Sequence, residues 1–90
     1  MYVHLGQDTV VWSGEILGVF DMENSTVSKH TRAFLARAQR ENRVINVSME
    51  LPRSYVVCLR EGRPTVYISQ IAPATLLRRI QRGPERMEIK

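Results

Sequence analysis

The pattern of apolar and polar positions is most regular between residues 52 and 71. Two stretches rich in β-branched and aromatic residues, 52–60 and 65–71, flank a link that contains glycine and proline. This chemistry predicts a β-hairpin whose strands are joined by a four-residue loop, 61–64. The first strand carries apolar residues on both faces, Tyr55, Val57 and Leu59 on one and Val56 and Cys58 on the other. The hairpin is therefore expected to supply an inner strand that is covered on each side.

Shorter stretches of the same kind predict strands elsewhere in the chain. Residues 2–5 and 9–12 are separated by three turn-forming residues, so a second hairpin is expected there. Residues 15–21 predict another strand, in which Gly18 marks a bulge or a close backbone approach. A further strand is expected over residues 44–48.

Two stretches have the spacing of amphipathic helices. The first helix is expected to begin near residues 25–28, where Ser and Thr side chains can cap it, and to run to about Glu41, with Asn42 as its stop. The second is expected over residues 72–82, because Pro73 is well tolerated in a first helical turn. Their apolar sides are formed by Val27, Thr31, Phe34, Leu35 and Ala38, and by Leu76, Leu77 and Ile80. Basic residues occupy the opposite sides.

These elements predict an α+β fold with an antiparallel sheet of about five to six strands and two helices. Residues 1–84 are expected to form a single domain, and residues 85–90 a flexible tail. A chain of 90 residues buries only about 60–65% of the surface that its unfolded form exposes, so its core is thin. Self-association is therefore a reasonable expectation before any motif is considered.

The distribution of charge is more informative than the net charge of +4. Residues 1–28 contain no Lys or Arg and have a net charge of −4, whereas residues 29–90 have a net charge of +8. Most of the basic residues are arginine. Such a split can steer a polyanion to one surface, can join the acidic part of one copy to the basic part of another, or can simply provide a solvated face.

The sequence lacks the residue patterns of several other functions. One cysteine and two histidines in different elements cannot compose a zinc site, and no Gly-rich phosphate loop or paired carboxylates indicate an enzyme. We expect no cofactor, no small-molecule substrate and no membrane span, and a cytoplasmic location. Cys58 is expected to be a buried, unreactive thiol. Trp12 and Tyr55 could stack on bases, but both are expected to be buried.

An ordered set of segments resembles a known family. The segments are Met1–Gly6, Glu15–Asp21, Pro52–Ser54 leading into Val56–Val57, and Tyr67–Ser69 continuing to Leu76–Ile80. Together they resemble the small bacterial regulators of extracellular matrix called RemA and RemB, most of all the RemB branch. The resemblance implies a firmicute-type bacterial protein that forms a ring-shaped homo-oligomer with a fold related to the LytTR DNA-binding domain. It also implies a DNA-binding transcriptional regulator of biofilm matrix genes.

Two positions depart from the RemA pattern. RemA-type proteins carry an arginine cluster in the loop before the Val-rich strand. Here that loop reads Glu50-Leu51-Pro52-Arg53, so only Arg53 carries over. Another arginine of RemA-type proteins, in the early strand region, falls near Glu15 in this chain.

The leading hypothesis from the sequence is an oligomeric DNA-binding regulator that contacts phosphates through arginines. The candidate residues are Arg53, Arg32, Arg37, Arg40, Arg60, Arg63, Arg78, Arg79 and Arg82. The alternative is a ring-forming protein-interaction module without direct DNA contact. In that alternative, acidic residues of one subunit meet the arginines of the next, and the acidic residues are Asp8, Glu15, Asp21 and Glu23.

Overall fold

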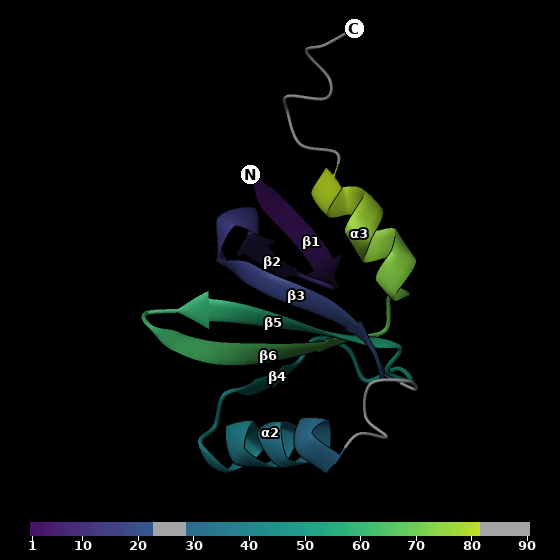
Figure 1. Cartoon of the computed structure of the whole chain (residues 1–90). Helices are drawn as coiled ribbons and strands as arrows, with labels where there is room; N and C mark the ends of the chain where they lie inside the picture. Colours follow the sequence, from purple (N-terminus) through teal and green to yellow (C-terminus); the bar gives the residue numbers. More distant parts are fainter. Residues whose placement is uncertain (23–28, 82–90) are drawn as a thin grey trace, which may run out of the picture.

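The computed structural model describes residues 1–22 and 29–81. Six strands and two helices follow one another along this part of the chain (Figure 1). They are β1 (Tyr2–Gly6), β2 (Thr9–Trp12), a short 3-10 turn (Ser13–Glu15), β3 (Ile16–Asp21), α2 (Lys29–Arg40), β4 (Val44–Asn46), β5 (Ser54–Arg60), β6 (Arg63–Ser69) and α3 (Pro73–Gln81). The α+β class with two helices is thereby confirmed. The expected start of the first helix, Arg82 and the expected tail lie outside the described residues.

The strands form two sheets, which corrects the expectation of one antiparallel sheet. β1 and β2 make a two-stranded antiparallel sheet, and the other strands make a four-stranded sheet in the order β3-β5-β6-β4. In that sheet β4 pairs with β6 in parallel. The pairings make β3 and β4 run in the same direction, because both are parallel to β6. The chain thus crosses from one edge of the sheet to the other through α2, as a helical crossover between parallel strands does.

The β5–β6 hairpin is tighter than the sequence pattern predicts. β5 ends at Arg60 and β6 begins at Arg63, so the loop has two residues and not four. Glu61 and Gly62 both have positive φ, 52° and 78°. Positive φ at both central residues matches the turn to the right-handed twist of the flanking strands, which favours this short connection. Pro64 consequently lies within β6, opposite Leu59.

The two faces of β5 enter two separate hydrophobic clusters. Val56 and Cys58 pack with residues of the β1–β2 hairpin and with Leu76 of α3. Tyr55 and Val57 pack against α2 on the other face. α2 therefore covers one side of the four-stranded sheet, and the β1–β2 hairpin and α3 cover the other (Figure 1). The predicted inner strand is confirmed, and so are the burial of Cys58 and Tyr55.

Some positions differ from the sequence pattern. Trp12 is exposed and not buried, because Val3 and Val11 are register partners on the inner face, and their neighbours Tyr2 and Trp12 point outward. Leu77 is also exposed, since the short α3 buries only Leu76 fully. The predicted irregularity near Gly18 is confirmed as a shift of register between β3 and β5.

Candidate nucleic-acid interface

Three arginines meet at the turn between β5 and β6. Arg60 and Arg63 are register partners on either side of the turn, and Arg43 comes from the segment between α2 and β4. All three line a surface hollow of about 320 Å³, together with Glu41 and Glu61. We call Arg43, Arg60 and Arg63 the hairpin-tip cluster. The carboxylates of Glu41 and Glu61, which line the same hollow, balance much of the positive charge of this cluster.

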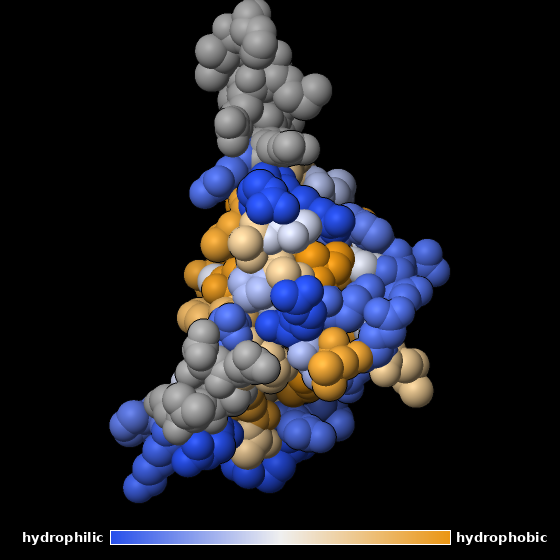
Figure 2. Space-filling model, turned by 90° about the vertical axis from the view of Figure 1, so that its right-hand side faces the viewer, coloured by the Kyte–Doolittle hydropathy of each residue, from blue (hydrophilic) through white to orange (hydrophobic). Residues whose placement is uncertain are grey.

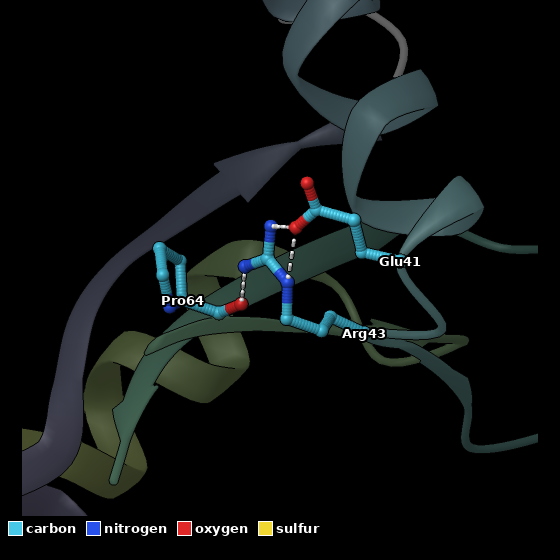
Figure 3. Close-up of polar contacts among 3 residues, drawn as sticks. All are labelled: Glu41, Arg43 and Pro64. Atoms are coloured by element: carbon cyan, nitrogen blue, oxygen red, sulfur yellow. Dashed lines mark hydrogen bonds and ion pairs between the residues drawn. The ribbon is translucent and has the colours of Figure 1, made fainter. Parts of the chain in front are cut away.

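Arg43 links the segment that follows α2 to strand β6 (Figure 3). Its Nε donates to Glu41 Oε1 at 2.9 Å, and a second guanidinium nitrogen donates to the same oxygen. A third nitrogen donates to the carbonyl oxygen of Pro64 in β6. The sequence pattern does not single out Arg43 as a candidate site residue. The two-residue spacing of Glu41 and Arg43 is the one local signal of their pairing, and the contact with Pro64 is visible only in the fold.

Arg60 is held by a tyrosine of the neighbouring strand. Its Nη1 donates to the hydroxyl oxygen of Tyr67 at 3.0 Å. This hydrogen bond raises the pKa of Arg60 above its ordinary value, and the charges of Tyr67, Glu15 and Glu61 act in the same direction. The hydrogen bond keeps the exposed guanidinium beside Tyr67.

The solvent side of α2 is a basic surface. The helix contains Lys29 and three arginines and no acidic residue. Its apolar side packs against the sheet through Phe34, Leu35 and Ala38, as the sequence pattern predicts. The basic side chains therefore project away from the sheet, and all are exposed; the arginines are Arg32, Arg37 and Arg40. Residues 41–43 connect this surface directly to the hairpin-tip cluster.

The remaining candidate arginines lie elsewhere. Arg53 precedes β5, on the order of 20 Å from Arg60, because a strand rises about 3.3 Å per residue. It lines a separate hollow of about 220 Å³ with Asp21 and Leu51. On α3, Arg78 donates to Thr75 at 3.3 Å and Arg79 donates to the carbonyl oxygen of His4 at 2.8 Å. α3 and α2 lie at opposite ends of the molecule (Figure 1).

Large apolar side chains are exposed on the loop between β4 and β5. Met49 is fully exposed and Leu51 is 82% exposed. On the face turned to the right in Figure 1, hydrophobic surface lies between hydrophilic regions (Figure 2). This loop therefore presents apolar groups to solvent.

The other chemistry of residues 1–22 and 29–81 concerns metal ligands, membrane-spanning helices and reactive side chains. No group of three or more His, Cys, Asp or Glu side chains in these ranges could hold a metal ion. No helix there is long and apolar enough to cross a membrane. The Cys58 thiol is fully buried, and burial raises its pKa to about 11. Ser54 and Ser69 are buried, and their hydroxyls donate to the carbonyl oxygens of Ile71 and Leu5.

These features define a small α+β protein that carries exposed arginines on a helix and at a hairpin tip. Residues 2–80 match the family described as RemA-like, extracellular matrix regulatory protein A-like. The chain is 32% identical over 81 residues to Extracellular matrix regulatory protein B of Bacillus subtilis (strain 168), an alignment that covers 90% of this chain and 91% of that protein. The chain belongs to the RemA-like family of extracellular matrix regulators, which confirms the resemblance found in the sequence.

Proposed function

We propose that this protein is an oligomeric DNA-binding regulator of extracellular matrix genes. The observation that carries the proposal is the basic side of α2, where Lys29 and three arginines project from a helix without a single acidic residue. Membership in a family of matrix regulators supports the regulatory role.

Phosphate contact is the chemistry that this surface fits. Arg37 and Arg40 are three positions apart and so lie side by side on the helix surface. Arg60 and Arg63 extend the positive surface beyond the end of α2. Arginine presents a planar fork of donors that matches phosphate oxygens, so these side chains suit a DNA backbone. The proposed contact surface is therefore α2 with the hairpin-tip cluster, and Arg53, beside Asp21, lies outside it.

The test of this proposal is binding to a long duplex DNA fragment over a range of salt concentrations. The four arginines named above are expected to contact phosphates in each subunit: Arg37, Arg40, Arg60 and Arg63. The logarithm of the binding constant should then fall against the logarithm of the salt concentration with a slope of about −3 to −4 per subunit. A slope near zero, or no binding at low salt, would contradict the proposal.

A specific observation also favours a second function, protein contact through apolar surface. Met49 and Leu51 project from one loop, and Leu17 is exposed on β3, an outer strand of the four-stranded sheet. Within the described residues, Glu15 already lies with Arg60, and Asp21 with Arg53, in their own chain. Exposed apolar side chains therefore offer a contact between copies in addition to the charge pairing expected from the sequence.

The mass of the protein in solution, measured with and without DNA, separates these two functions. A stable oligomer that ignores DNA supports the interaction module. An oligomer that shifts to a larger complex with DNA supports the regulator. A Leu51→Asp variant that becomes monomeric would place the contact at the loop, and a monomer at high concentration of the unchanged protein would contradict both assemblies.

A further inference from the structure

The outer face of the β1–β2 hairpin carries an aromatic pair that packing within the chain leaves exposed. Tyr2 and Trp12 are cross-strand partners, and their ring centroids lie 5.1 Å apart at an interplanar angle of 70°. Tyr2 is 70% exposed and Trp12 is 46% exposed. The inner face of the same strands buries Val3 and Val11. The strand alternation that builds the core thus sets both rings toward solvent.

The indole of Trp12 packs closely against a glycine. A Cβ atom added at Gly14 would lie 2.9 Å from Trp12 Nε1 and 3.1 Å from Trp12 Cδ1. The indole therefore rests against the backbone of Gly14, where an added side chain would force the ring to shift. The edge contact from Tyr2 supports the ring on one side, and part of its surface stays open.

Charged groups of both signs complete a hollow beside the ring. The hollow has a volume of about 250 Å³ and is lined by Tyr2, Val10, Val11, Trp12, Glu15, Arg60 and Tyr67. Arg60 is held there by its hydrogen bond to Tyr67. The site thus combines an aromatic surface, a fixed guanidinium and a carboxylate within one small space.

We propose that this hollow binds an unstacked nucleobase together with its phosphate. The base stacks on Trp12, as bases do on aromatic side chains in proteins that bind single strands. Arg60 contacts the phosphate. Glu15 accepts a hydrogen bond from an amino group of the base, which favours cytosine over thymine because only cytosine carries the N4 amino donor.

The bases of an intact duplex are stacked on one another and cannot offer a face to Trp12. The site therefore takes an unpaired stretch of a nucleic acid or a free nucleotide. This hollow shares only Arg60 with the duplex contact surface proposed above. Stacking of a base on Trp12 does not require the phosphate contacts of that surface.

Trp12 is the single tryptophan of the chain, so its fluorescence reports directly on this site. The probes are a short single-stranded deoxycytidine oligomer, the matching thymidine oligomer, an abasic oligomer of equal length, and free cytidine monophosphate. We expect the deoxycytidine oligomer to quench the fluorescence most and the abasic oligomer to leave it unchanged. Quenching by the free nucleotide at similar affinity would identify a nucleotide site, whereas quenching by the oligomers alone would identify a strand site. The absence of quenching by every probe would overturn the proposal.

Calorimetry with variants tests the role of each group. Trp12→Leu should weaken binding of the deoxycytidine oligomer by about tenfold or more, the usual effect of removing one stacking side chain. Glu15→Gln should reduce the preference for deoxycytidine over thymidine. Asp8→Asn removes a negative charge from the exposed β1–β2 turn, outside the hollow, and is the charge-matched control for Glu15→Gln. Its affinity for the deoxycytidine oligomer should stay within about twofold.

The same variants separate this proposal from the duplex contact. Trp12→Leu should leave the affinity for duplex DNA unchanged, and circular dichroism should show that the variant is folded. If folded Trp12→Leu retains full affinity for the single strand, base stacking at this site is refuted. If the folded Trp12→Leu variant loses affinity for the single strand and for the duplex to the same extent, a separate role of the ring in base binding is refuted.

Discussion

The hydroxyl of Ser69 donates a 2.7 Å hydrogen bond to the carbonyl oxygen of Leu5, 64 positions earlier in the chain. Both residues are fully buried, and the same hydroxyl oxygen accepts from the backbone nitrogen of Ile71 at 3.0 Å. The end of β6 is thereby joined to the end of β1. This contact sets the β1–β2 hairpin against the four-stranded sheet.

Replacing Ser69 should therefore loosen that junction. Ser69→Ala leaves the buried carbonyl of Leu5 without its donor, which should cost about 1–3 kcal/mol of the free energy of unfolding. Chemical denaturation followed by circular dichroism measures the loss. Ser48→Ala is the control, since the Ser48 hydroxyl oxygen accepts from the exposed backbone nitrogen of Glu50, and its effect should be below about 0.5 kcal/mol.

The turn of the β5–β6 hairpin predicts a second stability effect. Gly62 has φ of 78°, and an added Cβ would meet no atom within 4 Å. Gly62→Ala should therefore destabilise the protein through backbone strain alone, by about 1–2 kcal/mol. Gly62→Asn should recover part of this loss, because asparagine tolerates positive φ better. Equal melting temperatures for both variants and the unchanged protein would show that the turn adopts another conformation.

The buried thiol of Cys58 predicts how stability depends on pH. Burial raises its pKa from 9.0 to about 11, with a further contribution from Glu15, while Arg60 acts in the opposite direction. The unfolded state therefore ionises first as pH rises. The contribution of Cys58 is constant below about pH 8 and is lost between about pH 9 and 11. Cys58→Ala should flatten the fall of unfolding free energy in this window, and a thiol reagent at pH 8 should react only when the unchanged protein is unfolded.

The proposed DNA contact predicts a change in salt dependence. A double variant, Arg37→Gln with Arg40→Gln, should weaken duplex binding at low salt and reduce the steepness of the salt slope by about 2 per subunit. Gln39 lies between Arg37 and Arg40 in the sequence and is also exposed, so Gln39→Ala is the control for helix integrity. An unchanged slope in the double variant would exclude α2 from the contact.

The aromatic site predicts an effect at a residue that does not touch the ligand. Gly14→Ala would place a Cβ where the indole of Trp12 now lies, so the ring must shift. The affinity for the deoxycytidine oligomer should fall while the affinity for duplex DNA stays the same. The Trp12 emission maximum of the free variant reports the shift of the ring directly. An unchanged emission spectrum with unchanged affinity would show that the ring position is not set by Gly14.

The local sequence pattern predicted a strand or helix well where a single property, such as β-branched composition or helical spacing, decides the structure. The β-branched run from Tyr55 to Cys58 favours an inner strand in almost any context, and the structure buries that whole stretch. The apolar side of α2 follows from helical spacing alone. The exposure of Trp12 differs from the prediction because Val10, Val11 and Trp12 form a continuous apolar run, and such a run does not reveal which alternate positions face the core.

The candidate site could be predicted only as a set of residue types. The sequence identified the arginines and the excess of positive charge after residue 28. It could not group them, since grouping depends on which strand ends and helix ends lie together. The fold brings Arg60 and Arg63 beside the end of α2, leaves Arg53 at the far end of β5, and engages Arg79 with His4.

Local sequence pattern was sufficient to predict the α+β composition, the inner strand and the basic side of α2, and overall sequence similarity shows membership of the RemA-like family. These depend on periodicity and residue chemistry, which are properties of neighbouring positions. The tertiary structure decided the division into two sheets, the parallel pairing of β4 with β6, and the exposure of Tyr2 and Trp12 beside Arg60. These depend on contacts between distant segments such as Leu5 and Ser69, whose energies arise only after the chain has brought them together.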